Sequence, residues 1–195
     1  MATELTFRPA TLADTSALAV LLDIAGEGIP NSFWRELAGP GRSALEVGRE
    51  RARREEGGFS YRHATLAEAG GEIAAGLIVY PLDDPYDLNN LDDMPAHVHP
   101  LVRLEAQAPG SWYVNVLATF PEFRGQGIGT KLLDIAEDKG RAAGATTMSI
   151  IVGLWNEGAT RLYERAGYTT IAREQAVLPP KFPQAGDWLL MLKSL

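Results

Sequence analysis

Residues 114–133 read VNVLATFPEFRGQGIGTKLL, and the interpretation of the whole chain starts from this stretch. Its apolar beginning predicts a strand, Pro121 marks a turn, and the apolar spacing from Ile128 onward predicts a helix. The glycines in between allow a tight turn with uncovered N–H groups, and the helix N-terminus behind them carries partial positive charge. Arg124 adds a cation suited to phosphate. The segment therefore predicts an anion site, most naturally for the phosphates of a nucleotide-like cofactor.

Two common phosphate-binding motifs do not fit this stretch. A Walker A loop requires a fixed spacing from its first glycine to Gly-Lys-Ser/Thr, which Gly125 and Lys131 do not satisfy. The dinucleotide fingerprint requires a glycine three residues after Gly127, where the chain has Thr130. It also requires an acidic residue at the end of the next strand, and residues 147–152 contain none.

The pattern that does fit is Arg-x-x-Gly-x-Gly, formed by Arg124, Gly127 and Gly129 after a strand and a Pro-Glu-Phe turn. With these flanks it resembles the acyl-CoA pyrophosphate loop of the GNAT superfamily of N-acetyltransferases. The alternative is an ordinary strand–turn–helix junction in which the glycines serve geometry alone. The flanking strand and helix favour the resemblance.

A second segment, NEGATRLYERAGY from Asn156, resembles the late helix of the same family and the strand after it. Asn156 is a good N-cap and Gly167 a good C-terminal stop. At 3.6 residues per turn, Asn156, Ala159 or Thr160, and Tyr163 share one face. The resemblance implies that Asn156 contacts the cofactor, that the small residue allows close approach, and that the Tyr163 hydroxyl lies beside the thioester sulfur. The alternative for Tyr163 is a half-buried aromatic side chain packing on the sheet.

Composition limits the class of protein. With 195 residues, of which 46% are hydrophobic, the chain is long enough for one substantial domain, and the resemblance implies a single GNAT-like domain over residues 1–195. The net charge of -7 argues against nucleic-acid binding, which needs basic surface. No apolar run is long enough to span a membrane, and Met1–Leu5 lacks the features of a secretory signal. Without cysteine there is no thiol nucleophile. A cytoplasmic location is the simplest expectation.

The order of elements predicts an α/β (α+β) protein. Strands are expected at residues 5–8, 60–68, 72–80, from 111 to the turn at 121, 146–152, 168–177 and 187–192. Helices are expected after a cap at 11–14, and at 27–37, 44–56, 101–107, 127–143 and from 156. Gly70-Gly71 predicts a hairpin. The resemblance implies a GNAT fold, with a central mixed, mostly antiparallel sheet of about seven strands, a splayed pair of strands and flanking helices.

Residues 81–109 form a long loop-helix insertion before the cofactor strand, longer than in a minimal member of the family, and long loops are often functional. We expect the insertion on the acceptor side. It contains five aspartates that either attract a cationic substrate or are ordinary solvated loop residues: Asp83, Asp84, Asp87, Asp92 and Asp93. His97 and His99 lie two residues apart, but no third ligand is fixed by spacing, so no metal is predicted.

The resemblance implies that acetyl-CoA is the cosubstrate and assigns main-chain roles to two groups of residues. One group donates backbone N–H groups to the pyrophosphate, with Arg124 shaping the loop: Gly125, Gln126, Gly127, Ile128, Gly129 and Thr130. The other pairs its main chain with the pantetheine arm, as an added strand would: Leu117, Ala118 and Thr119.

The expected reaction is direct attack of an amine on the acetyl group. The N–H of Leu117 polarises the acyl carbonyl, and Tyr163 is the general acid that protonates the leaving thiolate. Tyr113 and Asn115 are poor bases, so Glu105 is assigned as general base by its position alone, beside the loop aspartates and a water chain as alternatives.

The expected acceptor is a small-molecule amine, because the chain has the size of a single domain and carries the acidic loop within residues 81–109. The resemblance leaves a homodimer open. Two other classes of function stay open at this stage. One is a catalytically weak acyl-CoA-binding sensor or regulatory protein with the same fold. The other is an unrelated α/β interaction protein.

Overall fold

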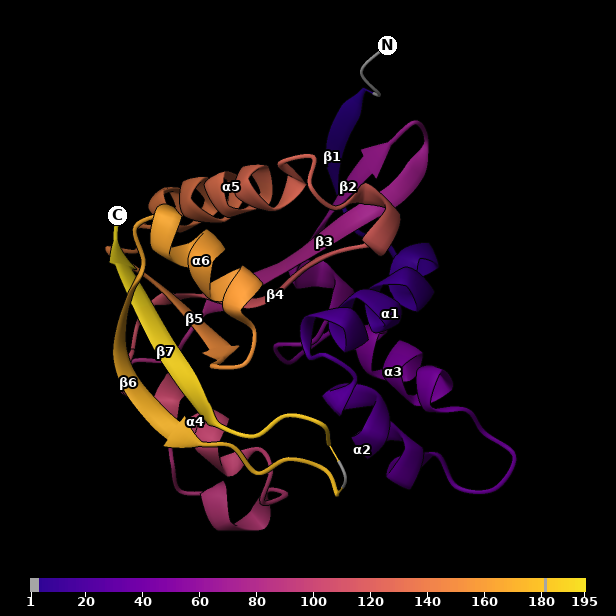
Figure 1. Cartoon of the computed structure of the whole chain (residues 1–195), viewed down its shortest axis with the longest axis vertical. Coiled ribbons are helices and arrows are strands. Elements are labelled where there is room, and N and C mark those ends of the chain that lie inside the picture. The colour runs from indigo at the N-terminus through magenta and orange to yellow at the C-terminus, as the bar shows by residue number, and fades with distance from the viewer. Residues whose placement is uncertain (1–3, 181) are drawn as a thin grey trace. The chain divides into compact units, whose positions relative to one another are not determined.

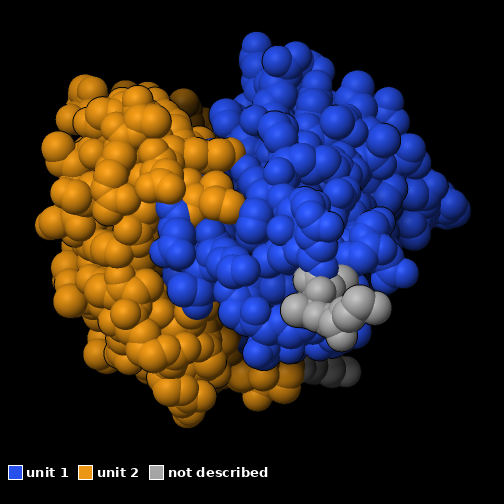
Figure 2. All heavy atoms as spheres, turned by 90° about the horizontal axis from the view of Figure 1, so that it is seen from above, with its two compact units in different colours: residues 1–79, 115–134 blue, residues 80–114, 135–195 orange. Residues whose placement is uncertain are grey.

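The computed structural model describes residues 4–180 and 182–195. The prediction that Met1–Leu5 lacks the features of a secretory signal therefore falls partly on residues 1–3, which lie outside the described residues. Contacts divide the chain into two compact units, coloured separately in Figure 2. The first comprises residues 1–79 and 115–134, and the second residues 80–114 and 135–195. Each unit draws on two separate stretches of sequence. The assignment of residues 1–195 to one domain stays a prediction.

Seven strands form one sheet in the order β1-β2-β3-β4-β5-β7-β6 (Figure 1). Their bounds are β1 Leu5–Pro9, β2 Ala64–Ala69, β3 Glu72–Pro81, β4 Trp112–Thr119, β5 Thr147–Gly153, β6 Thr169–Gln175 and β7 Asp187–Ser194. Strand β4 pairs with β5 in parallel through Trp112–Met148 to Val114–Ile150. The pairs β1–β2, β2–β3, β5–β7 and β6–β7 are antiparallel. The mixed, mostly antiparallel sheet is confirmed, whereas the splayed pair of strands stays a prediction.

The first unit packs three helices beside the sheet residues it contains: α1 Thr15–Ala25, α2 Ile29–Ala38 and α3 Ala44–Ala52. Helix α1 approaches β3 closely, because a Cβ at Gly76 would lie 2.9 Å from Leu21 Cδ1. Trp34 of α2 covers Gly48 of α3 in the same way, with ring carbons as close as 2.5 Å to the site of a Cβ. Both glycines are therefore required by close packing.

Helix α3 ends at Ala52, earlier than the predicted boundary at residue 56. The following residues, Arg53 to Glu56, are exposed. Acidic residues are unfavourable at a helix C-terminus, which carries partial negative charge, so Glu55 and Glu56 favour an earlier end. Strand β2 likewise begins at Ala64, after a turn of 3₁₀ helix at Tyr61–His63. The hairpin at Gly70-Gly71 is confirmed, with both glycines at positive φ.

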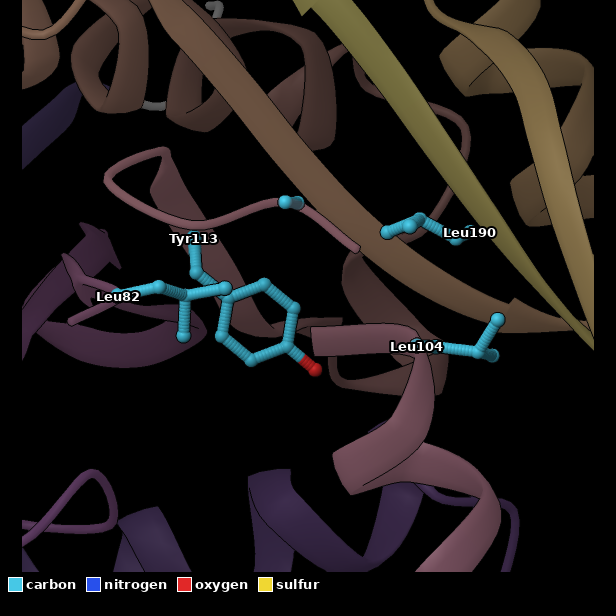
Figure 3. Packing of buried hydrophobic residues seen from close by; sticks show 5 residues of the cluster. Leu82, Leu104, Tyr113 and Leu190 are labelled. Atoms are coloured by element: carbon cyan, nitrogen blue, oxygen red, sulfur yellow. The ribbon is translucent and has the colours of Figure 1, made fainter. Parts of the chain in front are cut away.

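The second unit contains α4 His99–Glu105 and α6 Glu157–Arg165 together with β5, β6 and β7. Helix α4 begins two residues before the predicted helix because Pro100 lies in its first turn, where proline is favourable. Figure 3 shows the buried cluster to which α4 contributes Leu104, together with Leu82, Tyr113 and Leu190. The insertion is closed at its base by backbone hydrogen bonds from Leu82 N to Ser111 O at 2.9 Å and from Gly110 N to Asp83 O at 3.3 Å.

Helix α5, Ile128–Ala142, begins in the first unit and ends in the second. Ile128, Leu132 and Ala136 are buried as predicted, but Ile135 is only half-buried. The side chain buried beside it is Glu137, whose carboxylate lies 2.5 Å from Lys193 Nζ of β7. Apolar periodicity does not detect a buried carboxylate whose cation comes from a distant strand. Within the described residues, no helix has both the length and the apolar character needed to cross a membrane.

An ion-pair network ties the first strand to the residues before α1. Arg8 bonds both carboxylate oxygens of Asp14 at 2.8 and 2.9 Å and reaches Glu68 at 2.7 Å. The backbone N–H and the hydroxyl of Thr11 also donate to Asp14, at 2.7 and 2.9 Å. The Arg8 guanidinium is the largest cause that lowers the pKa of the buried Asp14 carboxyl, from 3.8 to about 2.

Replacing Arg8 by methionine should therefore lower the free energy of unfolding by about 2 kcal/mol at pH 7, because a buried carboxylate loses its cation. Asp14 stabilises the fold only while ionised, so the difference from wild type should shrink as the pH falls from 3.8 towards about 2. Urea unfolding at a series of pH values measures both effects. Arg161→Met is the control, because its bond to Glu157 at 2.9 Å is exposed and should contribute about 0.5 kcal/mol at most. Equal losses in the two variants would contradict the role given to Asp14.

Candidate active site

The loop after β4 is held by its own strand and by the neighbouring one. Phe120 N donates to Ala74 O of β3 at 2.9 Å, and a turn of 3₁₀ helix follows at Pro121–Phe123. Arg124 then folds back, its Nε donating to Thr119 O at the end of β4 at 3.2 Å. The predicted part of Arg124 in shaping the loop for a cofactor stays a prediction.

Two glycines in this loop have backbone conformations that other residues rarely adopt. Gly125 and Gly127 both have φ of +75°, and a Cβ at either would meet no atom within 4 Å. The loop is therefore left-handed at two points and open outward at both. Gln126 between them is exposed as well.

Helix α5 presents its N-terminus directly behind this loop. Its first backbone bond runs from Lys131 N to Gly127 O at 3.3 Å, so the earlier N–H groups have no acceptor within the helix. The first turn contains no acidic residue. Gly129 has no side chain and Thr130 has no charge, while Ile128 is buried and anchors the turn. These features fit a bound pyrophosphate, which needs uncovered N–H groups and partial positive charge.

The strand residues assigned to the pantetheine arm alternate in burial. Ala118 is buried, whereas Leu117 and Thr119 are half-buried. The carbonyl of Thr119 already accepts from Arg124. Pairing of this strand with the cofactor, and the carbonyl-polarising N–H of Leu117, stay predictions.

Helix α6 begins and ends where the sequence predicted. Asn156 Oδ1 accepts from Ala159 N at 3.1 Å, and the Asn156 carbonyl accepts from the Thr160 hydroxyl at 3.1 Å. At the other end Gly167 has φ of +94°. The cap uses the side-chain oxygen of Asn156, so the amide nitrogen is not engaged by the cap. Asn156 can therefore both cap the helix and donate to a ligand.

Tyr163 lies on the buried face of α6, with 6% of its surface exposed. Its ring centroid is 6.1 Å from that of Tyr168. Burial raises the pKa of the Tyr163 hydroxyl, so it is protonated throughout the physiological range. A protonated phenol is the form that a general acid requires. The burial of Tyr163 agrees with the alternative, an aromatic side chain that packs on the sheet. Such packing does not exclude a role as general acid, which stays a prediction.

Glu105, assigned from position alone, lies in a more specific setting than the sequence indicated. It ends α4 and receives a hydrogen bond from the Tyr86 hydroxyl, with a second from Tyr113. Burial is the largest cause that raises the pKa of Glu105, and both hydroxyls oppose it. Residue spacing carries no signal for this cluster, because its members come from a loop, a helix and a strand.

The two histidines of the insertion are not gathered with other possible ligands. His99 Nε2 lies 2.8 Å from the carbonyl of Met94. Over residues 4–180 and 182–195, no group of three or more His, Cys, Asp or Glu side chains is arranged to hold a metal ion.

Comparison with known proteins agrees with this geometry. Residues 30–168 match the model of the acetyltransferase (GNAT) family. The chain therefore belongs to this family.

Two curated relatives match a part of the chain. The acetyltransferase Atu2258 of Agrobacterium fabrum is 42% identical over 82 residues, which are 42% of this chain and 56% of that protein. The mycothiol acetyltransferase of Propionibacterium freudenreichii is 34% identical over 68 residues, 35% of this chain and 22% of that protein. The chain thus covers less than two thirds of either relative.

Solved structures match nearly the whole chain in fold. A mosquito arylalkylamine N-acetyltransferase like 5b gives a TM-score of 0.69 at 17% identity, covering 98% of this chain and 100% of that one. A Drosophila melanogaster polyamine N-acetyltransferase gives 0.68 at 16% identity, with coverage of 98% and 100%. At these identities the likeness is one of fold.

Replacing Asn156 by alanine should lower stability by about 1 kcal/mol, because Ala159 N loses its cap. Asn156→Asp keeps a capping oxygen but removes the side-chain amide donor. We expect it to retain wild-type stability in thermal unfolding and to bind acetyl-CoA more weakly in calorimetry. Retained affinity in the aspartate variant would limit Asn156 to its capping role.

Proposed function

We propose that this protein transfers an acetyl group from acetyl-CoA to the primary amine of a small molecule. The observation that carries the proposal is the open, left-handed loop at Gly125 and Gly127 in front of the N-terminus of α5. Membership of the acetyltransferase (GNAT) family supports it. The acidic net charge of -7 is consistent with a cationic acceptor and not with nucleic acid.

The proposed binding of acetyl-CoA uses main-chain groups. The N–H groups of residues 125–130 receive the pyrophosphate, and those of residues 117–119 receive the pantetheine arm. The amide of Asn156 is a further donor, and Ala159 adds no bulk on the same face of α6. Acetyl-CoA supplies the activated acetyl group.

The proposed reaction needs no covalent enzyme intermediate. Glu105 takes a proton from the acceptor ammonium, and the neutral amine forms a C–N bond with the acetyl carbon. The N–H of Leu117 stabilises the negative charge that develops on the carbonyl oxygen. As the C–S bond breaks, sulfur keeps the electron pair and receives the proton of the Tyr163 hydroxyl. The remaining extra proton on nitrogen restores the Tyr163 phenol, so one proton is released overall, from Glu105.

The acceptor, the location and the oligomeric state are part of the proposal. A small amine is favoured because solved structures with this fold include a polyamine and an arylalkylamine N-acetyltransferase by name. A cytoplasmic location and a homodimer stay predictions from the sequence.

The first test is isothermal titration with acetyl-CoA and desulfo-CoA. Wild type should bind both, and Gly127→Trp should bind neither, because the indole fills the space in front of α5. Gly144→Trp is a matched control, because Gly144 has φ of +80° and also meets no atom within 4 Å of a Cβ. It carries the same backbone strain at the other end of the helix and should bind normally. Absence of binding to folded wild type would refute the proposal.

Turnover is tested by thiol release with a panel of primary amines. Tyr163→Phe should lower kcat about 100-fold and leave the affinity for acetyl-CoA unchanged, because only the proton donor is removed. Tyr168→Phe is the control, since the Tyr168 hydroxyl is buried and finds no hydrogen-bond partner among the described residues. Binding without thiol release for any amine would instead support a sensor.

A further inference from the structure

The carboxylate of Glu105 is surrounded by three tyrosines within the second unit. Tyr86 and Tyr113 donate their hydroxyls to it. Tyr80 lies close enough for the Glu105 charge to raise the pKa of its hydroxyl, and its ring stands edge-on to Tyr113 with centroids 5.6 Å apart. Figure 3 shows Tyr113 with its hydroxyl directed towards the helix that carries Leu104, the residue before Glu105. The carboxylate is thus enclosed by rings and held by neutral donors.

The two hydroxyl donors are held very differently. Tyr113 belongs to β4, is 4% exposed, and packs in the cluster with Leu82, Leu104 and Leu190. Tyr86 is half-buried and lies in irregular chain between β3 and α4. The first donor belongs to a strand and to the core of the cluster, whereas the second belongs to a loop and only packs against the edge of that cluster. Tyr86 is therefore the donor whose displacement would disturb the sheet less.

The charges around Tyr86 suit an approaching cation. The residues beside it in the loop, Asp83, Asp84 and Asp87, are exposed. Asp83 is close enough to contribute to the raised pKa of the Tyr86 hydroxyl. Residues 81–109 contain six carboxylates and one arginine, Arg103. Such an excess of one sign attracts the opposite charge.

The other elements packed against α4 bring no unpaired cation to Glu105 within the described residues. On β6, Glu174 lies 3.9 Å from Arg103 of the helix, and Arg173 is exposed. From β7 the packed side chains are apolar or aromatic, and include Trp188, Leu190 and Leu192. Glu105 is half-buried, and a carboxylate that is partly withdrawn from water without a cation is costly, so an ammonium ion would relieve that cost.

We propose that Glu105 and Tyr113 form the fixed part of a subsite for the ammonium group of the acceptor, and that Tyr86 is its exchangeable part. The hydroxyl of Tyr86 occupies the position on the carboxylate that the ammonium takes. This inference rests on the proposed function and assigns its acceptor side. The surroundings of the subsite are aromatic and aliphatic, so the acceptor is a primary ammonium on an apolar chain, with phenethylamine as its probe.

The exchange conserves hydrogen bonds and leads to the proton transfer. One N–H of the ammonium replaces the O–H of Tyr86 on Glu105, and the released phenol turns to water or to the acidic loop. The ammonium proton then passes to a Glu105 oxygen, leaving a neutral amine and a neutral carboxylic acid. Burial favours this step from both sides, because it disfavours the charged form of each partner.

The kinetic test separates the two tyrosines at saturating acetyl-CoA. Tyr86→Phe removes the competitor for the carboxylate, so we expect the KM for phenethylamine to fall about fivefold with kcat unchanged. Tyr113→Phe removes a fixed donor and should raise that KM. Tyr61→Phe is the matched control, because its hydroxyl bonds Glu55 at 3.0 Å on the surface. The same change of KM in Tyr86→Phe and Tyr113→Phe would refute the distinction between an exchangeable and a fixed donor. A lower KM for spermidine than for phenethylamine would refute the inference that the acceptor carries an apolar chain.

The pH profile of kcat/KM gives a readout that a structural role alone would not move. Activity should rise with pH as Glu105 ionises, with a midpoint above the ordinary 4.5 of glutamate. Both hydroxyls lower the pKa of Glu105, so each phenylalanine variant should shift the midpoint to higher pH. Glu105→Gln should lower kcat/KM about 100-fold and abolish this limb. An unshifted midpoint in both phenylalanine variants would refute the cluster.

A measurement without turnover keeps this inference separate from the proposed function. Because the folded pKa of Glu105 is raised, its stabilising protonated form is lost as the pH rises above 4.5 through the folded value. The free energy of unfolding of wild type should therefore fall relative to that of Glu105→Gln over that range. In Tyr86→Phe the pKa of Glu105 is higher, so the free energy of unfolding should continue to fall up to a higher pH. If the protein shows this pH dependence of stability but no turnover, acetyl transfer is refuted and the environment inferred for Glu105 is kept. Active protein with no such pH dependence would refute the subsite alone.

Discussion

Strands β2 and β3 bury their central residues on both faces, and this constraint governs the first unit. An antiparallel pair with one solvated face shows alternating burial. Here the run from Ala74 to Val79 is buried without a break. Covering it requires apolar side chains from helices, and the close approach of Leu21 to Gly76 is one result. Hydrogen bonding from Phe120 to Ala74 then fixes where the loop before α5 starts.

Among the described residues, Asp14 and Glu137 are buried acidic side chains and Glu105 is a half-buried one, and their charges are balanced in different ways. Asp14 is matched by Arg8 and Glu137 by Lys193, so each has a cation in the fold. Glu105 is matched by phenol hydroxyls, which are neutral. In the first two arrangements, removal of the cation would leave a buried carboxylate uncompensated, which is strongly destabilising. The third involves no cation among the described residues, and in our proposal the ammonium group of the acceptor supplies it.

Local sequence was sufficient to predict what depends on neighbouring residues. The helix beginning after Asn156, the stop at Gly167, the hairpin at Gly70-Gly71 and the strand–loop–helix order around Gly127 all follow from caps, turns and periodicity. The surroundings of Glu105 could not be predicted in this way, because three separate elements supply them. The burial of Glu137 was missed for the same reason.

The glycine hairpin has a practical consequence when combined with the composition. The chain contains no cysteine, and Glu72, immediately after Gly70-Gly71, is exposed at the end of the hairpin. A cysteine introduced at position 72 would be the single thiol of the protein, at a position with ordinary strand geometry. It would accept a fluorophore or a spin label in one defined place. The protein is thus suited to site-specific spectroscopy without prior removal of native thiols.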